Sequence, residues 1–391
     1  MSALPEKMTP RERVHAAARG LPVDRVPVMY WFNPHLACRL MAEFQQARSR
    51  LNQAAAVAHW KSFKEQGELG APELVRALPH TLNEYANGKY ALELGADAVI
   101  EPVGAGGNVS RMYWEGGSLR VLDAYHSVRA LGGIYMDVVE PAIKSVADLK
   151  DYRFPDFSQS KHYSYIRKLR KRYPGASIMM ENFGVQDFFS TQIWSMPPFM
   201  MALCEYPDEV KAYQQRFADW AVDTAYRGVK AGADIVFIYD DYGYTGRTLI
   251  SMDMWKEFTY PHLKRIIGAV HDAGALTMLH SCGFQTPFLD YYVEAGLDIL
   301  QAFQPKAGND FKSAYSKYGD RLAFATGIDV QQGEQMTPLQ MRESILTAYR
   351  TGKLHGRFIL GMTHMLQYTM PAENISAIFN TVREIQDGRH G

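Results

Sequence analysis

One pattern repeats from end to end of the chain: a short apolar run is followed by a segment long enough for a helix. Most of these runs are apolar on both faces, which is typical of strands in a buried parallel sheet. Eight runs occur: "VPVMYW" from Val26, "DAVIEP" from Asp97, "SIMMENF" from Ser177, "DIVFIYDD" from Asp234, "ALTMLH" from Ala275, "DILQAF" from Asp298, "LAFATGID" from Leu322 and "RFILGMTH" from Arg357. Parallel neighbours need crossover helices, and eight such strands close into a filled cylinder. The sequence therefore predicts a (β/α)8 TIM barrel.

A doubly wound open sheet is the main alternative to a barrel. It would need a glycine-rich phosphate turn directly after the first strand, and "VPVMYWFNPH" contains none. The run "GAGGNVS" after the second strand lacks dinucleotide-binding spacing, so we interpret it as a loop.

The extra sequence of the predicted barrel is concentrated in its N-terminal part. We predict a single barrel domain over residues 1–391 with insertions near 33–94 and 108–140. The first insertion is predicted to be largely helical. The second, "RMYWEGGSLRVLDAYHSVRALGGIYMDV", alternates like β-hairpins with Gly-Gly turns. Both insertions are expected to cover the mouth of the barrel.

Charge and cysteine content exclude several classes of function. The chain carries 42 basic and 42 acidic residues, and the basic ones are scattered, so a nucleic-acid partner is not expected. No apolar run approaches the roughly 18 residues that span a bilayer, and the N-terminal segment has no apolar core, so we expect a cytoplasmic protein. Cys38, Cys204 and Cys282 lie too far apart for a paired framework. We interpret Cys38 and Cys204 as core fillers.

Polar groups that can bind a metal follow several predicted strands, where the mouth of a barrel lies. In "LHSC" the side chains of His280 and Cys282 are two residues apart, so an extended backbone points both to one side. The alternative is a hydrogen-bonded histidine beside a small buried cysteine. Imidazole with thiolate favours Zn²⁺, and a catalytic zinc needs three protein ligands. The third is either His364 or a carboxylate such as Glu181 or Asp240.

Carboxylates and aromatic residues around the same mouth are further candidates. Glu181, Asp240 and Asp241 are expected to act as a ligand, as groups that orient His280, or as acids toward a substrate oxygen. The alternative for "YDD" is that one aspartate caps the next helix. Tyr30, Trp31 and Tyr242, among other aromatic residues near the rim, suit contact with an aromatic ligand or a tetrapyrrole face, with simple packing as the alternative.

Several segments in order resemble the uroporphyrinogen decarboxylase-like superfamily. They are "MTPRERVHAAARGLPVDRVPV", "IKSVADLKDYRFPD", "GADIVFIYDD", "HSCG", "ATGIDVQQ" and "FILGMTHMLQYTMPAENISAI", and together they run nearly end to end. The resemblance implies a (β/α)8 barrel. The haem-pathway decarboxylase carries an arginine-rich segment after the first strand, and the corresponding stretch here is "YWFNPHLACR". Without clustered guanidinium groups, an octa-anionic porphyrinogen would be poorly neutralised.

The His-x-Cys pair is similar instead to that of the zinc-dependent corrinoid methyltransferases. In the coenzyme M branch a second cysteine follows far downstream, but here Thr363 and His364 stand at that place. The chain therefore looks closer to the first methyltransferases of O-demethylase systems. That resemblance implies Zn²⁺, an aryl methyl ether or another small methylated donor, and transfer to the cobalamin of a corrinoid protein. A decarboxylase-like lyase, methyl transfer from a corrinoid to tetrahydrofolate or a thiol, and a non-catalytic protein that binds a corrinoid or tetrapyrrole remain alternatives.

No corrinoid-binding motif of the form Asp-x-His-x-x-Gly is present in the chain. The cobalamin is therefore expected to arrive on a partner protein or as the free cofactor.

Overall fold

The centre of the molecule is a closed barrel of eight parallel strands, in the order β1-β14-β13-β12-β11-β8-β7-β2. The computed structural model describes residues 7–43, 61, 91–101, 109–116, 118–132, 135–186 and 189–389. All eight predicted runs supply a barrel strand, which confirms the (β/α)8 barrel. The strands are β1 (Val28–Met29), β2 (Ala98–Glu101), β7 (Ser177–Phe183), β8 (Ile235–Tyr239), β11 (Leu276–His280), β12 (Ile299–Gln301), β13 (Ala323–Ile328) and β14 (Phe358–Met362).

Side chains of these strands divide between two apolar clusters, because successive residues of a strand point to opposite faces. One cluster lies between the strands and the surrounding helices. The other fills the inside of the barrel and contains Met29, Met179, Phe237, Met278 and Ile359. Val14, Ala17 and Ala18 of helix α1 (Pro10–Ala18) belong to the inner cluster, so α1 closes the N-terminal end of the barrel.

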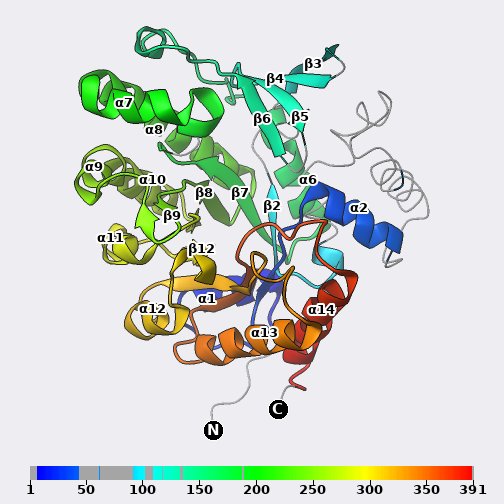
Figure 1. Ribbon diagram of the computed structural model, residues 1–391. Coiled ribbons are helices and arrows are strands. Elements are labelled where there is room, and N and C mark those ends of the chain that lie inside the picture. The colour runs from blue at the N-terminus through cyan, green and yellow to red at the C-terminus, as the bar shows by residue number, and fades with distance from the viewer. Residues whose placement is uncertain are drawn as a thin grey trace.

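Helices form a ring outside the strands (Figure 1). Helix α8 ends at Gly232, whose φ of 114° is the left-handed conformation that favours glycine. The segment from Met252 to Asp272 forms two helices, α9 and α10, because Pro261 begins a new helix at its first turn. The helices after α1 are α2 (Pro34–Glu43), α6 (Ser164–Arg172), α7 (Met196–Glu205), α8 (Pro207–Ala231), α9 (Met252–Phe258), α10 (Tyr260–Asp272), α11 (Leu289–Ala295), α12 (Phe311–Tyr318), α13 (Pro338–Gly352) and α14 (Ala372–Gln386).

Three barrel strands begin with the same local sequence, Gly-x-Asp. In each, the glycine has a positive φ and ends the preceding segment, and the aspartate stands at the start of the strand. The aspartate carboxylate accepts the backbone N–H at or next to the start of the neighbouring strand, which sets the strand register. Asp97 accepts from Val28 N, Asp234 from Ile178 N, and Asp298 from Thr277 N.

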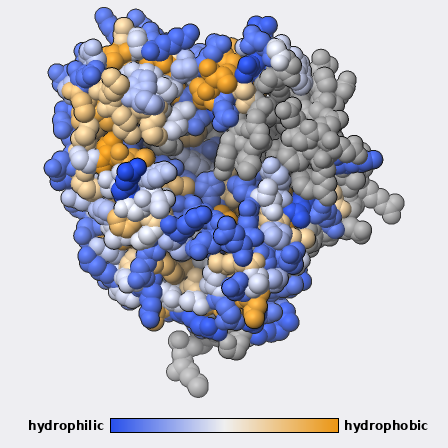
Figure 2. Space-filling view, in the orientation of Figure 1, coloured by the Kyte–Doolittle hydropathy of each residue, from blue (hydrophilic) through white to orange (hydrophobic). Residues whose placement is uncertain are grey.

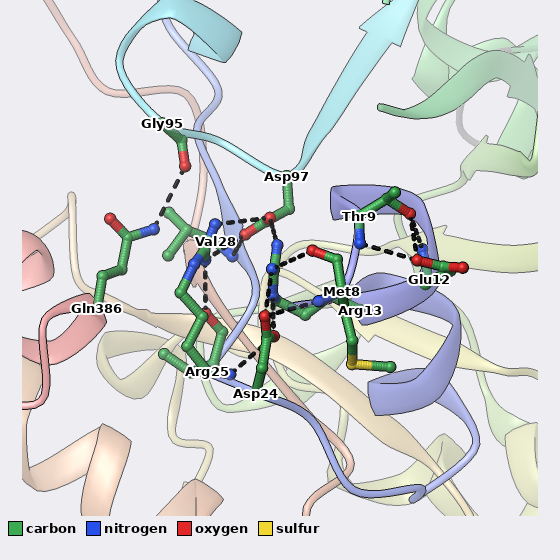
Figure 3. A network of polar contacts seen from close by, with 11 residues as sticks. Met8, Thr9, Glu12, Arg13, Asp24, Arg25, Val28, Gly95, Asp97 and Gln386 are labelled. Atoms are coloured by element: carbon green, nitrogen blue, oxygen red, sulfur yellow. Dashed lines mark hydrogen bonds and ion pairs between the residues drawn. The ribbon is translucent and has the colours of Figure 1, made fainter. Parts of the chain in front are cut away.

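Asp97 is the centre of an ion network at this end of the barrel (Figure 3). Its side chain is fully buried and lies 2.5 Å from Arg13 and 2.8 Å from Arg25. Arg13 also donates to Asp24, at 2.6 Å. Because Arg13 belongs to α1, the network ties the closing helix to the start of β2.

The predicted hairpin insertion is a four-stranded antiparallel sheet in the order β3-β4-β5-β6. Ser127 Oγ donates to Gln192 O at 2.8 Å, so the sheet is bound to the loop that follows β7, at the C-terminal end of the barrel. Of the other predicted insertion, α2 and the residues from 91 on are described, and residues 44–60 and 62–90 lie outside the described part. The strands of the sheet are β3 (Val109–Glu115), β4 (Ser118–Asp123), β5 (Val128–Gly132) and β6 (Tyr135–Glu140).

The space-filling view shows hydrophobic groups near the top of this face, where α7 and the four-stranded sheet lie (Figure 2). Exposed apolar residues of these elements include Met201, Trp114 and Val139. Cys204 is also exposed on α7, so its prediction as a core filler was wrong. The side chain of Cys38 lies outside the described part of the chain. Within the described residues, no helix has the length and apolarity to cross a bilayer.

Candidate metal centre

Three residues predicted as metal ligands come together at the C-terminal end of the barrel. His280 is the last residue of β11, Cys282 follows two residues later, and His364 lies two residues beyond the end of β14. One possible ligand atom from each of the three lies within 4.8 Å of the others. Cys282 Sγ is 3.3 Å from His280 Nε2. We call these three residues the triad.

The backbone after β11 reaches this position because two glycines allow close contact with the loop after β8. Gly283 has a φ of 78°, and a Cβ atom there would lie 2.2 Å from the carbonyl carbon and oxygen of Gly243. A Cβ on Gly243 would lie 2.4 Å from the backbone nitrogen of Phe284. The two loops are joined by a hydrogen bond from Phe284 N to Tyr244 O, at 3.0 Å. Only a residue without a side chain fits at either position.

The orientation of His280 is set by Gln301, the last residue of β12. Gln301 Nε2 donates to Met362 O at 2.8 Å, which leaves Gln301 Oε1 as the acceptor for His280 Nδ1. His280 Nδ1 therefore carries the proton, and Nε2 keeps a free lone pair on the side of Cys282. Burial lowers the pKa of His280 to about 4, partly opposed by the Gln301 hydrogen bond, so the ring is neutral at pH 7.

Cys282 is held through its backbone and its sulfur. Its N–H donates to Asp241 Oδ1 at 2.5 Å, and its carbonyl accepts from Gln285 Nε2 at 2.6 Å. Gln304 Nε2 lies 3.4 Å from Sγ. Asp241 Oδ1 is also 3.9 Å from His280 Nε2, so this carboxylate, predicted as a catalytic group, stands beside the triad. Burial raises the pKa of Asp241.

His364 completes the triad from the other side of the barrel mouth. Its Nδ1 accepts the backbone N–H of Met365 at 2.8 Å, so its neutral ring carries a proton on Nε2. Burial and the nearby His280 lower the pKa of His364 to about 4. To ligate a metal as a neutral imidazole, His364 must give up the hydrogen bond from Met365, because Nδ1 then either binds the metal or carries the proton. His280, in contrast, already presents an unprotonated nitrogen.

Two residues of the triad, Cys282 and His364, line a cleft of about 630 Å³. Among its described lining residues Lys306 is the cation and Asp241 and Glu334 are the acids, so the lining carries little net charge. Tyr244, with 58% of its surface exposed, is the aromatic residue among them. The lining consists of Asp241, Gly243, Tyr244, Thr245, Cys282, Gly283, Gln304, Lys306, Ala307, Val330, Gln331, Glu334, His364, Met365 and Gln367.

The donor atoms of the triad fit Zn²⁺. Two imidazoles that are neutral at pH 7 and one thiol give the nitrogen and sulfur donors that zinc prefers over magnesium and calcium. Three protein ligands in an open cleft are the number that leaves a place for a substrate.

Asp240 and Tyr242, two other predicted site residues, lie outside the cleft lining. Asp240 is 1% exposed, and its carboxylate accepts from Gln186 N at 3.0 Å and from the Tyr242 hydroxyl at 2.8 Å. Tyr242 is fully buried against Trp255 and Phe288. The structure thus places both in the packing behind the loops after β7 and β8.

The remaining predicted residues occupy different places. Trp31 is 9% exposed and stacks on the ring of His364 with 5.3 Å between the ring centroids, so it forms the floor beneath the triad. Glu181 stands on β7, two strands from His280, and is also outside the cleft lining. Tyr30 lies on the outer side of the barrel wall, with its ring 5.3 Å from Phe379 of α14.

From the sequence, Gln301 is expected at the barrel mouth but without a chemical role, and Gln304 is not expected in the site. Gln301 lies inside the predicted strand "DILQAF" and Gln304 follows that strand directly, at the barrel end where the candidate ligands stand. An amide at such a place is the signal that could have identified them.

Comparison with known proteins supports the fold and establishes the family. The chain resembles the structure of a methyltransferase from Methanosarcina mazei, with a TM-score of 0.70, 19% identity, and coverage of 96% of this chain and 99% of the other. A B12-independent methionine synthase from Shewanella sp. W3-18-1 gives a TM-score of 0.47 at 12% identity, covering 82% of this chain and 89% of that one. No curated protein sequence is significantly similar to the chain.

The sequence profile of the family described as "Uroporphyrinogen decarboxylase (URO-D)" matches residues 133–385. The match spans more than half of the chain and includes β7 to β14, and therefore the whole triad. The chain belongs to the uroporphyrinogen decarboxylase (URO-D) family.

Proposed function

We propose that the protein is a zinc-dependent methyltransferase. In this proposal a methyl group moves from a small methylated donor to the cob(I)alamin of a separate corrinoid protein. The donor that we propose is an aryl methyl ether. The observation that carries the proposal is the triad of His280, Cys282 and His364, of which Cys282 and His364 line an open cleft. The methyltransferase from Methanosarcina mazei, whose fold this chain shares, supports the same reaction class.

His280, Cys282 and His364 would hold the zinc, which supplies a Lewis acid for the oxygen from which the methyl group departs. One thiolate and two neutral imidazoles leave such a site with a net positive charge, which suits stabilisation of a leaving oxygen. Asp241 Oδ1 accepts the Cys282 N–H. In this proposal Asp241 Oδ2 carries the proton that is transferred to the oxygen of the methyl donor when the methyl group departs. Burial, which raises the pKa of Asp241, favours its protonated form.

The cleft supports a small donor better than a polyanion. Its described lining offers one cation, Lys306, and two acids, so a substrate with many carboxylates would be poorly neutralised. Tyr244 supplies an exposed ring at the edge for an aromatic donor. The cobalamin acceptor would approach from the open side of the cleft. The proposal includes a cytoplasmic location, since the thiol of Cys282 must stay reduced to bind metal.

The test is metal analysis combined with a methyl-donor screen against reduced cobalamin. We expect about one Zn²⁺ per chain, and we expect Cys282→Ala to lose both the metal and the methyl transfer. His364→Ala tests the third ligand, and its loss of metal should be smaller if His364 acts as a proton donor instead. Full activity in a metal-free preparation would end the proposal.

Decarboxylation is the second candidate, and the family description favours it. A lyase of this kind would act on a smaller acid, with Lys306 as the cation for a carboxylate. Release of CO₂ by the Cys282→Ala protein, with no methyl transfer by the unmodified protein, would select this alternative.

A further inference from the structure

We propose that Gln301 and Gln304 form a clamp that holds the two halves of the triad at ligand spacing. One half, His280 and Cys282, lies at the end of β11, and the other half, His364, follows β14. Two strands, β12 and β13, separate them in the barrel. This inference rests on the proposed metal site, and it assigns positioning roles to two residues that do not themselves ligate the metal.

Gln301 connects the two halves at the level of His280. It lies beside His280 in the strand register, and its Oε1 accepts from His280 Nδ1. Its Nε2 donates to the carbonyl of Met362, the last residue of β14, at 2.8 Å. Because a carbonyl only accepts, the amide has a single orientation, and that orientation requires the proton of His280 on Nδ1. The same side chain thus selects the histidine tautomer that can bind a metal through Nε2.

Gln304 connects the same two halves of the triad, closer to the cleft than Gln301. Its Oε1 accepts from Gly283 N at 3.0 Å, which turns Nε2 toward the sulfur of Cys282 and the carbonyl of Thr363, each at 3.4 Å. Thr363 is the residue before His364. Gln304 is 2% exposed, so these contacts are made in a nearly dry environment in which amide hydrogen bonds orient strongly.

The side chain of Gln301 passes over strand β13 to reach Met362 of β14, and β13 has small residues along this path. Gln301 pairs in register with Ala325 of β13, and Ala325 belongs to the cluster inside the barrel together with Ala323. Gly327, two residues further along β13, has a φ of 115°, and a Cβ atom there would point outward, toward Ala348 of α13. A larger inward side chain at 325 would occupy the path from Gln301 to Met362, so the sequence "LAFATG" is compatible with the crossing.

Glutamine also suits this position electrostatically. A carboxylate at 301 would face the carbonyl of Met362 without a proton to donate, and it would add negative charge beside the triad. Two amides orient the ligands and leave the charge of the site unchanged.

The test compares zinc affinity, measured by chelator competition, in Gln301→Leu, Gln304→Leu and Gln332→Leu. Leucine keeps the approximate size and removes both amide contacts. Gln332 is the matched control, because it is a glutamine at the same barrel end whose Nε2 donates to Asp329 at 2.9 Å. We expect each clamp variant to lose about 10- to 100-fold in zinc affinity, the range found when groups that orient metal ligands are removed, and the control to stay within about twofold. Affinities within about twofold for all three variants would overturn the clamp.

A second measurement works without metal and separates this inference from the proposed function. Nitrogen-15 spectra of the histidines in the metal-free protein should show His280 protonated on Nδ1, and Gln301→Leu should abolish that preference. Gln301→Glu should retain it, since an acceptor for Nδ1 remains. If the protein binds no zinc, the proposed function fails while these spectra still decide the tautomer. An Nε2-protonated His280 in the unmodified protein would refute the clamp even if zinc binds.

Discussion

Gly283→Ala is predicted to damage the candidate metal site without changing any ligand. At this position φ is 78°, and the new Cβ would lie 2.2 Å from the backbone of Gly243. The left-handed conformation alone costs an alanine about 1–2 kcal/mol. The contact adds an overpacking cost of about 1–3 kcal/mol, since the atoms that must move belong to the backbone rather than to a flexible side chain.

Relief of this contact requires the loops after β8 and β11 to separate. Cys282 moves with Gly283, and the 2.5 Å hydrogen bond from its N–H to Asp241 lengthens. We therefore expect the free energy of unfolding to fall by about 2–5 kcal/mol and zinc affinity to fall by about tenfold or more.

Gly274→Ala is the matched control. Gly274 precedes β11 and has a φ of 92°, and a Cβ atom added there would meet no atom within 4 Å beyond its chain neighbours, so the substitution carries only the conformational cost. Chemical denaturation and chelator competition on both variants give the two quantities. Equal losses of stability in both variants, together with unchanged zinc affinity in Gly283→Ala, would refute the claim that the glycine contact positions Cys282.

Three further changes test other parts of the structure. Asp97→Ala leaves Arg13 and Arg25 without their shared buried partner, so thermal or chemical denaturation should show a loss of about 3–5 kcal/mol, while zinc affinity at the opposite barrel end stays unchanged. The hydrogen bond from Arg13 lowers the pKa of Asp24 to about 2. The ionised Asp24 therefore contributes about 2 kcal/mol to the free energy of unfolding above pH ~4, and this contribution is lost as the pH falls from about 4 through 2. Asp24→Asn should flatten this part of the plot of stability against pH, and an unchanged plot would contradict the pairing. Tyr244→Ala should raise the KM for an aryl methyl ether by roughly 2- to 10-fold, whereas the KM of Tyr244→Phe should stay close to that of the unmodified protein. An equal rise in KM for aliphatic methyl donors would show that Tyr244 does not recognise the aromatic ring.

The alternation of apolar runs and helices was sufficient to predict the barrel, since a buried parallel strand must be apolar on both faces whatever surrounds it. The same local reasoning identified His280 and Cys282, because two residues apart on an extended chain point to one side. The Gly-x-Asp starts of β2, β8 and β12 are also local, and they are readable in the sequence as a repeated signal.

What only the tertiary structure decided is which strand ends meet. His364 comes from β14 and is 82 residues from Cys282, a distance along the chain that no spacing rule covers. Asp240 and Asp241 are adjacent in sequence, yet one is buried behind the loops and the other faces the cleft, because the chain turns between them. Gln301 and Gln304 gain their partners only when the barrel closes and brings β11 and β14 within reach of amide side chains from β12. Local sequence determines the direction of a side chain relative to its own strand, whereas closure of the barrel determines what that side chain meets.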